Sequence, residues 1–546
     1  MPPGHKRRNL LHGIGAATAM GLAGCLGAGS DGSSGNTVTD AIREEPRNMN
    51  PYQTTRFVDL TALQFVVEPL LTLNDDFEPV PLVADDWEWG EEKKSITFTL
   101  KDLTFHDGSD VTSEDVAASL DRYTSQSPLA SYLPEESGGI TNTKMPSDDE
   151  ITFEFAESRP LALNFFADGH TAIQPKSLIE EARNGNTNIG QDGLVGTGPY
   201  EFDEWRSGNS ITLAKFEDYN HGPDFVGNDG PVLADEYVLE IVPEASTRKN
   251  AVSQGDASIT FHLPPKFVES LEQNGGVGVT IDPAYGAQYM ACNAERGPTA
   301  EEDVRVALAH AVDKEAIVNK AWSGVGFPID GLITEATTGY WEGVKDVAYQ
   351  NDLETARQHL DDAGWTNSSQ GETRTKDGDE LSLDLITFSD LDQWRSAGTI
   401  IQNQLGNIGV SVNVDTAEVG QIYDRGNEGD YHLIIAKNMW WFGPTYLDFL
   451  CHSRNIGSSN YGRLQGETAA EMDENLETAM NALSNEERQT AIENVQRIAV
   501  ESAAYIPLAS RTWRGAWNKS AVDGVEAVTE HPWWPALSRA LNLDPA

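Results

Sequence analysis

One stretch in the second half of the chain constrains the fold most, because strand and helix patterns alternate there. The runs 381–388, 410–414 and 431–437 have the apolar composition of strands, and helical patterns occupy 394–405 and 419–427 between them. Strands that alternate with helices predict right-handed crossovers and a parallel sheet, so we expect an α/β fold. The last run is apolar at nearly every position, which is typical of a strand with both faces covered.

The ends of these predicted strands mark a candidate binding site, since ligands of open parallel sheets bind beyond the carboxyl ends of the strands. The segments that follow two of the strands contain Arg395 and the pair Trp440 and Trp441. Arg395 begins a predicted helix, where its guanidinium could hold a carboxylate through two bonds, helped by the helix N-terminus. The alternative is an exposed arginine. The two tryptophans are expected to stack on a ligand or wall the cleft, or else to lie in the core.

The charge balance is strongly acidic and excludes one large class of function. The chain has 546 residues, with 86 Asp and Glu against 38 Lys and Arg, and a formal net charge of -48. A surface of this sign opposes binding to the phosphate backbone of nucleic acids. Acidic residues occur along the whole chain, which favours adaptation to concentrated salt over a single acidic binding face, and the composition resembles that of extreme halophiles such as haloarchaea. The hydrophobic fraction of 39% still allows a buried core.

The N-terminus predicts export and a lipid anchor. Residues 1–24 have the pattern of a signal peptide, and the adjacent Arg7 and Arg8 before a short apolar stretch resemble a twin-arginine signal. The Leu-Ala-Gly-Cys sequence that ends at Cys25 resembles a lipobox, in which lipid is added to the cysteine sulfur. The alternative is a plain secretory signal with an incidental cysteine. Residues 25–37 have the composition of a flexible tether, and we expect the body of the protein on the extracellular face of the cell membrane.

The two remaining cysteines, Cys292 and Cys451, carry little functional signal. They have no C-x-x-C spacing, so the sequence predicts neither a zinc knuckle nor a redox motif. They could form a disulfide outside the cell or remain two separate buried thiols.

Four motifs in register resemble one family. They are Phe105-His-Asp-Gly108 with Ser113-Glu-Asp-Val116, then Val195-Gly-Thr-Gly-Pro-Tyr200, then Asp303-Val-Arg-Val-Ala-Leu308 with Ala311-Val-Asp313, and finally residues 356–365. This set resembles the signatures of extracellular solute-binding proteins of ABC importers, of the peptide/nickel type known as family 5. The order and spacing hold from about residue 40 to about residue 520, which is nearly the whole chain after the signal.

The resemblance implies a two-lobed periplasmic-binding-protein-like fold of type II, with an extra subdomain in the first lobe. In chain order, the segments would be 38–65 in lobe I, 66–188 in the extra subdomain, 189–285 in lobe I, 286–502 in lobe II and 503–546 back in lobe I. Crossing strands would join the lobes, which would close on a solute like a hinge. The protein would be a monomer without a cofactor that delivers a dipeptide- or oligopeptide-like solute to an ABC transporter permease.

The resemblance also implies where the solute would bind. Arg395 matches the position that holds a peptide carboxylate, and Asn50 lies in an Asn-Pro loop that reaches the cleft in relatives. Tyr446 aligns with the acidic residue that holds the peptide ammonium, and Asp448 lies two residues beyond it. Tyr285 lies where the chain would cross to lobe II and completes the candidate contacts.

Two alternatives to a peptide receptor stay open from sequence. Gly443-Pro444 resembles a segment of the nickel-receptor branch, so nickel or a metal chelate is one alternative ligand. The metal-contacting histidine of that branch is missing, and His452 is a single donor where metal sites need several, so no metal site is predicted. The other alternative is a secreted hydrolase, although the chain has neither a G-x-S-x-G nor an H-E-x-x-H motif.

Most residues of the family motifs are expected to serve the scaffold. Gly108 and Gly198 suit turns or close backbone contacts, and His106 suits a hydrogen bond within a loop. Arg305 and Asp313 are expected on a helix, as a surface ion pair.

The acidic composition leads to a salt prediction. Removing salt should lower the melting temperature, because at least 48 uncompensated negative charges then repel one another without screening. Thermal unfolding followed by circular dichroism in low and multimolar KCl measures this. A melting temperature that is the same at both concentrations would contradict salt adaptation.

Overall fold

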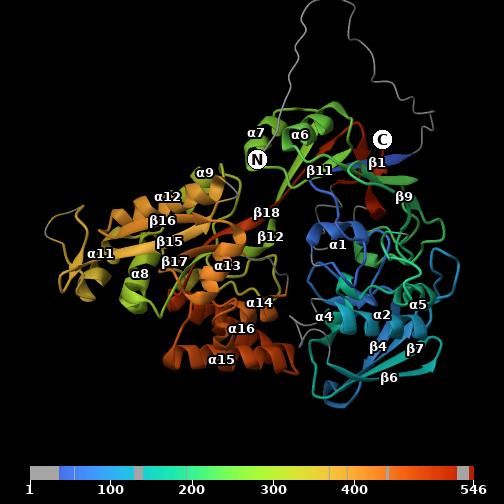
Figure 1. Ribbon diagram of the computed structural model, residues 1–546, viewed down its shortest axis with the longest axis horizontal. Helices are drawn as coiled ribbons and strands as arrows, with labels where there is room; N and C mark the ends of the chain where they lie inside the picture. Colours follow the sequence, from blue (N-terminus) through green and yellow to red (C-terminus); the bar gives the residue numbers. More distant parts are fainter. Residues whose placement is uncertain are drawn as a thin grey trace, which may run out of the picture. The chain divides into compact units, whose positions relative to one another are not determined.

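A computed structural model describes residues 36–54, 56–127, 139–191, 193–367, 369, 371–389, 392–437, 442–525 and 540–546 (Figure 1). The predicted signal, Cys25, Trp440 and Trp441 lie outside these residues, so the functions expected of them remain predictions. All described residues belong to one unit of the chain, Asn36–Ala546.

A ten-stranded sheet organises this unit. Its strands follow the order β16-β15-β17-β12-β18-β11-β1-β10-β9-β8. Their bounds are Ser411–Ala417 (β16), Ser382–Phe388 (β15), Leu433–Lys437 (β17), Val277–Cys292 (β12), Tyr505–Asn518 (β18), Ile259–Phe261 (β11), Thr37–Ile42 (β1), Glu236–Ile241 (β10), Ser210–Lys215 (β9) and Tyr200–Arg206 (β8). The two longest strands, β12 and β18, lie at the centre and pair antiparallel over most of their length.

Among the described residues, two large hydrophobic cores and a small third cluster show that the fold has two lobes. Residues between 38 and 261, together with 522–543, supply the core of the first lobe, and residues between 287 and 508 supply that of the second. β12 pairs with β17 of the second lobe through residues 288–292, whereas β18 pairs with β11 of the first lobe through 515–517. The β12–β18 pair is therefore the connection between the lobes, as expected for a two-lobed α/β fold.

The alternating segment of the second lobe folds as its pattern predicts. β15 pairs parallel with β16 and with β17, and helices α12 (Asp392–Gly406) and α13 (Val419–Glu428) connect them in sequence. The other helices of this lobe are α8 (Glu302–Ala311), α9 (Lys314–Ala321), α10 (Val344–Val347), α11 (Leu353–Asp362), α14 (Gly443–Cys451), α15 (Gly466–Asn481) and α16 (Asn485–Glu501), and β13 (Thr375–Lys376) pairs with β14 (Asp379–Glu380). The parallel sheet predicted from sequence is thereby confirmed.

The first lobe contains a second, antiparallel sheet within the segment 66–188. Its order is β4-β5-β7-β6, with bounds Ala84–Trp89, Ser95–Leu100, Glu150–Phe155 and Ile140–Ser147. Helix α2 (Ser113–Gln126) packs on this sheet and begins with a capping box, in which Thr112 N donates to Asp115 Oδ2 at 2.9 Å. The remaining elements of the lobe are α1 (Phe57–Leu63), α4 (Ala162–Phe166), α5 (Lys176–Arg183), α6 (Ala245–Gln254) and α7 (Val268–Glu272), and the strand pairs β2 (Leu71–Leu73) with β3 (Pro79–Pro81) and β19 (Val522–Asp523) with β20 (Asp544–Pro545).

The glycines of the Gly-Thr-Gly-Pro motif are scaffold residues, as expected. A Cβ atom on Gly196 would lie 2.2 Å from the carbonyl oxygen of Val66, and one on Gly198 would lie 2.7 Å from that of Phe65. His106 binds the same turn, because its Nδ1 accepts from Gly196 N at 3.3 Å while Nε2 lies 2.9 Å from Gly198 O. The motif therefore holds the extra sheet's loop against the start of the first lobe.

The expectation of a surface ion pair between Arg305 and Asp313 is wrong. Arg305 is 4% exposed, and its guanidinium donates to the carbonyls of Ser502 at 3.0 Å and Thr299 at 3.1 Å. Asp313 instead caps α9, where its Oδ1 accepts from Ala316 N at 2.8 Å. A buried arginine can remain charged here because backbone carbonyls take its donors.

Cys292 and Cys451 are both free and buried. Of the two possibilities left open by sequence, the structure therefore has separate thiols and no disulfide. Burial raises the pKa of Cys292 to about 12, so its thiol stays protonated at neutral pH.

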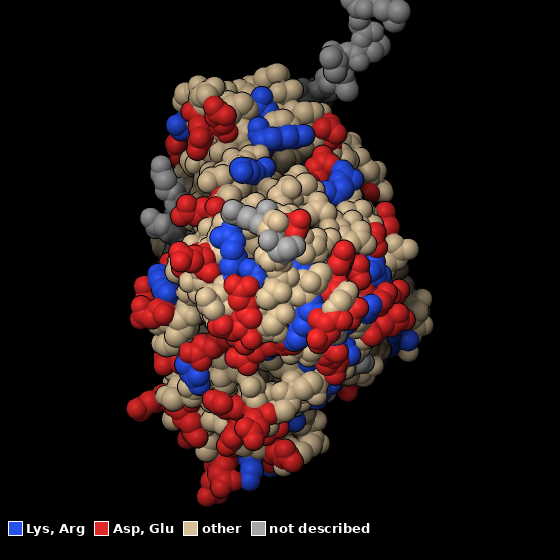
Figure 2. Space-filling view, turned by 90° about the vertical axis from the view of Figure 1, so that its left-hand side faces the viewer, with Lys and Arg blue, Asp and Glu red and all other residues tan. Residues whose placement is uncertain are grey.

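The acidic side chains do not form a single patch on the face seen in Figure 2. They are spread over its whole height, with lysines and arginines interspersed among them. This distribution is the one expected if the acidic composition serves the surface in general rather than one binding face.

Gly196 allows a test of the motif's role. Gly196→Ala should lower stability by about 1 to 3 kcal/mol, since the new methyl group must displace the backbone of Val66. The control is Gly420→Ala, because position 420 lies in α13 and a Cβ atom there meets nothing within 4 Å. Urea unfolding of both variants measures the difference, and equal stability would show that the contact is not restrictive.

Candidate functional site

A cavity of about 680 Å³ opens where the two lobes meet the crossing strands. The first lobe lines it with the end of β1, helix α1 and the segments after β10 and β11. The second lobe lines it with the first turn of α12, the segment after α9 and Lys437 at the end of β17. The middle of the wall comes from β12 and β18. The cavity therefore includes the carboxyl ends of parallel strands, which is where the sequence pattern predicts a ligand.

The second-lobe wall is aromatic and carries one cation. Trp394 packs edge-on against Phe388, with ring centroids 5.5 Å apart, and against Trp322 at 5.7 Å. The ammonium of Lys437, the last residue of β17, lies 4.8 Å from the Phe388 ring and 5.3 Å from the Trp394 ring. The strand ends thus present a charge whose apolar surroundings strengthen its interaction with a ligand.

The crossing strands contribute a second aromatic group. The ring of Trp513 on β18 lies 5.2 Å from His262 and 5.9 Å from Tyr285. His262 has a positive φ of 58°, a backbone conformation that residues other than glycine rarely adopt. The register of β12 against β18 also shifts between residues 284 and 287. Strain and bulges of this kind are found where a strand must re-aim its side chains at a ligand.

The first-lobe wall carries charges of both signs. Asp40 on β1 is 1% exposed and accepts from the hydroxyl of Tyr237 at 3.1 Å. Glu44 accepts from Arg43 at 3.1 Å and from Arg56 at 2.5 Å. The carboxylate of Glu44 is therefore already compensated within the first lobe.

Arg395 is not among the residues that line this cavity. Its side chain is 52% exposed, forms an ion pair with Asp392 and donates to Ser389 O at 3.4 Å. The adjacent Gln393 and Trp394 line the cavity instead. Successive side chains of a helix point about 100° apart, so a shift of one position separates the cavity from the solvent. A ligand role for Arg395 remains a prediction.

Tyr446 and Asp448 lie on α14, away from the cavity lining. Tyr446 is 0% exposed and belongs to the second-lobe core. Asp448 accepts from Arg454 at 2.5 Å. The sequence pattern could not show this, because α14 is apolar on nearly every side and buries almost all of its residues.

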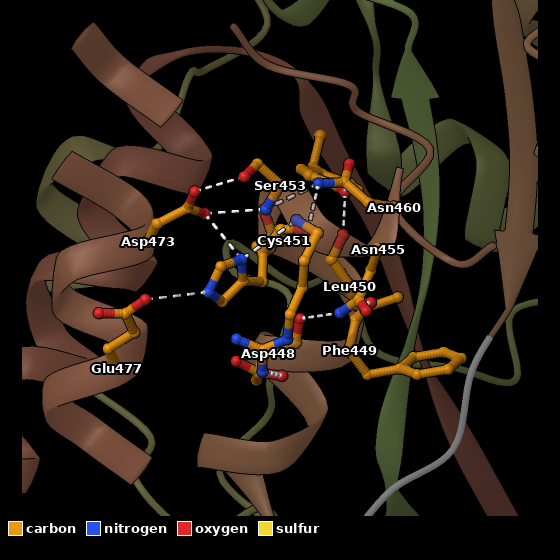
Figure 3. Close-up of polar contacts among 12 residues, drawn as sticks. Asp448, Phe449, Leu450, Cys451, Ser453, Asn455, Asn460, Asp473 and Glu477 are labelled. Carbon is orange, nitrogen blue, oxygen red and sulfur yellow. Dashed lines mark hydrogen bonds and ion pairs between the residues drawn. The ribbon is translucent and has the colours of Figure 1, made fainter. Parts of the chain in front are cut away.

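The imidazole of His452 contacts two carboxylates. Asp473 and Glu477 extend toward it from α15 (Figure 3), with His452 Nδ1 3.1 Å from Asp473 and Nε2 3.8 Å from Glu477. Across the part of the chain that the structure describes, no group of three or more His, Cys, Asp or Glu side chains could hold a metal ion.

Asn50 and Tyr285 have different positions relative to the cavity. Asn50 is 2% exposed and accepts from Tyr52 N at 3.1 Å, so its side chain closes its own Asn-Pro turn. Tyr285 is 6% exposed and packs against the ring of Trp513, which lines the cavity. Sequence reasoning missed Trp513 and His262, because neither follows a recognisable motif and they meet only when β18 pairs beside β11.

Comparison with known proteins shows what this architecture belongs to. The family model for bacterial extracellular solute-binding proteins, family 5 (Middle) matches residues 78–458. The chain belongs to this family. Members are binding proteins, so the chain is a solute-binding protein of the ABC-importer kind and not a hydrolase.

Individual relatives agree with this assignment. The chain is 26% identical over 448 residues to the probable D,D-dipeptide-binding periplasmic protein DdpA of Escherichia coli (strain K12), covering 80% of each chain. It is 25% identical over 389 residues to the dipeptide-binding protein of the same organism, covering 67% of this chain and 68% of the relative.

Solved structures share the fold. NikA from Brucella suis, in complex with Fe(III)-EDTA, superposes with a TM-score of 0.81 at 22% identity, covering 93% of this chain and 100% of that one. DppA from Helicobacter pylori, in complex with the peptide STSA, superposes with a TM-score of 0.71 at 21% identity, covering 94% and 98%. Within the described residues, no helix is both long and apolar enough to cross a membrane.

Two variants test whether the solute binds in the cavity or at Arg395. Trp513→Ala should weaken retention of any co-purifying solute by roughly 10-fold or more, since aromatic side chains at the centre of a site carry much of its binding energy. Arg395→Ala should change it little, because its guanidinium is exposed and paired with Asp392. Native mass spectrometry of both proteins gives the occupied fraction. The reverse result would restore Arg395 as the main anchor.

Proposed function

We propose that this protein captures a peptide-like organic solute in the cavity and delivers it to an ABC transporter permease. The observation that carries the proposal is the composition of the cavity wall, to which both lobes and both crossing strands contribute. A solute held there contacts groups that move relative to one another when a hinge bends. Its binding therefore favours the closed arrangement, and opening releases it.

The lining suits a solute with an apolar body and a few polar or charged groups. Trp322, Trp394 and Trp513 provide flat apolar surface, while Gln288 and Ser510 provide polar groups on the crossing strands. A few polar groups on a mainly apolar wall are typical of small-molecule sites. The relatives whose names specify dipeptides support a peptide-like solute for this chain.

A metal chelate is the second candidate. The solved NikA structure contains Fe(III)-EDTA, and a chelate brings its own metal ligands. The lack of a metal-binding cluster among the described residues is therefore compatible with a chelate, although it argues against a bare ion.

We further propose that lipid at Cys25 anchors the protein on the extracellular face of the membrane after export by the twin-arginine pathway. Arg7, Arg8 and Cys25 at their offsets support this, and a Gly- and Ser-rich tether follows. The acidic composition supports a habitat of concentrated salt.

Cys25→Ser should release the protein from membranes into the medium, because the sulfur that would carry the lipid is gone. Cell fractionation with immunoblotting measures this, with Cys292→Ser as the control, since Cys292 is buried in the second lobe. A Cys25→Ser protein that stays with the membrane would contradict the anchor.

The binding function itself is tested by identifying what co-purifies. Native mass spectrometry, followed by unfolding and analysis of the released compound, should find an unmodified organic solute. A peptide would support the first candidate and a metal complex the second. An empty protein that binds no member of a peptide and chelate library would contradict the proposal.

A further inference from the structure

The cavity reverses the charge balance of the chain. Among the described residues, its lining contains four basic residues, Arg43, Arg248, Lys437 and Arg514, and two acidic residues, Asp40 and Glu44. In the whole chain acidic residues outnumber basic ones, 86 to 38. Because a random sample of this surface would be acidic, the basic excess indicates a wall that attracts negative charge.

Arg248 is the most informative of these residues. It lies in the first turn of α6, is 2% exposed, and its Nη1 donates to the carbonyls of Val242 at 2.8 Å and Pro243 at 2.9 Å. Its Nε is buried without a hydrogen-bond partner among the described residues. Within the same residues, no carboxylate lies within the 4.0 Å of an ion pair. Backbone carbonyls take the Nη1 donors of Arg248, as they do for Arg305, but the unpartnered Nε is a buried donor that an acceptor on a ligand would satisfy.

The charged groups around Arg248 do not supply this acceptor. Burial and then the like charge of Arg43 lower the pKa of Arg248, and the opposite effects of Glu244 and Asp40 are smaller. Asp40 accepts from the hydroxyl of Tyr237. The guanidinium of Arg248 in the first-lobe wall therefore favours binding of an anion.

Positive charge also reaches the cavity from the other two parts of the wall. Arg514 on β18 is held in place, with its Nε donating to Leu263 O at 2.7 Å. Lys437 faces the cavity from the second lobe, over the rings of Phe388 and Trp394. An anion between these groups interacts favourably with both lobes at once, and this differential interaction favours closure.

We propose that the cavity selects organic solutes of net negative charge and that Arg248 binds a carboxylate of the solute. This inference rests on the proposed function, in which the cavity holds the solute. It goes further by excluding zwitterions and cations of the same size as preferred ligands. If the cavity preferred zwitterions or cations instead, Asp40 would be the group that binds the ammonium of the ligand.

Three matched dipeptides test the charge preference. Ala-Ala is a zwitterion, N-acetyl-Ala-Ala is an anion and Ala-Ala-amide is a cation, so they share side chains and differ mainly in charge. Calorimetry in one KCl concentration should rank the anion first and the cation last. A zwitterion that binds as tightly as the anion would overturn the inference and leave the proposed function intact. If none of the three binds, the inference is contradicted, whereas the proposed function is decided separately by the peptide and chelate library.

Variants of Arg248 test the assignment to one residue. Arg248→Met should weaken binding of N-acetyl-Ala-Ala by about 30-fold or more, with a much smaller effect on Ala-Ala-amide. Arg248→Lys should recover part of the affinity, since an ammonium keeps the charge but not the planar fork. The matched control is Arg206→Met, because Arg206 lies on β8, is 62% exposed and pairs with Glu204.

The ratio of the affinity for N-acetyl-Ala-Ala to the affinity for Ala-Ala-amide separates a binding role of Arg248 from a structural role. Arg248 also holds the turn at Val242 and Pro243, so its loss could disturb the wall as a whole. That disturbance would lower all three affinities by a similar factor and would overturn the assignment to Arg248. A ratio that collapses in Arg248→Met but not in Arg206→Met supports it.

Discussion

The antiparallel pairing of β12 with β18 is the constraint on which the rest of the structure depends. These strands run through the centre of the ten-stranded sheet, and each pairs on its other edge with a strand of a different lobe. Two hydrophobic cores, which share no buried residues, are thereby joined through backbone hydrogen bonds. The pair is therefore the hinge that the proposed closure on a solute requires.

The same pair creates the site. Its register shift between residues 284 and 287 lies in the cavity wall, next to the ring of Trp513 and the strained backbone of His262. A regular ladder would point alternate side chains into either face of the sheet. The irregular stretch instead leaves space for a ligand between walls that come from the two lobes. The second-lobe wall is aromatic and carries Lys437, and the first-lobe wall carries buried charges.

Charge serves two separate purposes in this protein. On the face shown in Figure 2, acidic residues are spread widely, a distribution that suits solubility in concentrated salt. Inside the cavity, arginines and a lysine dominate, and their low-dielectric surroundings make each charge count for more than it would in water. The overall charge therefore says little about the ligand, whose chemistry depends on a few residues with the opposite sign.

The sequence by itself determined the α/β class and the parallel arrangement of β15, β16 and β17, because periodicity acts over a few residues. It also led to the correct family. It did not determine which side chains face the cavity. Arg395 and Trp394 differ by one position on a helix, and Tyr446 is buried by contacts with distant segments. Only the tertiary structure brought Arg248, Trp513 and Lys437 to one cavity, because their proximity depends on pairing between strands far apart in the chain.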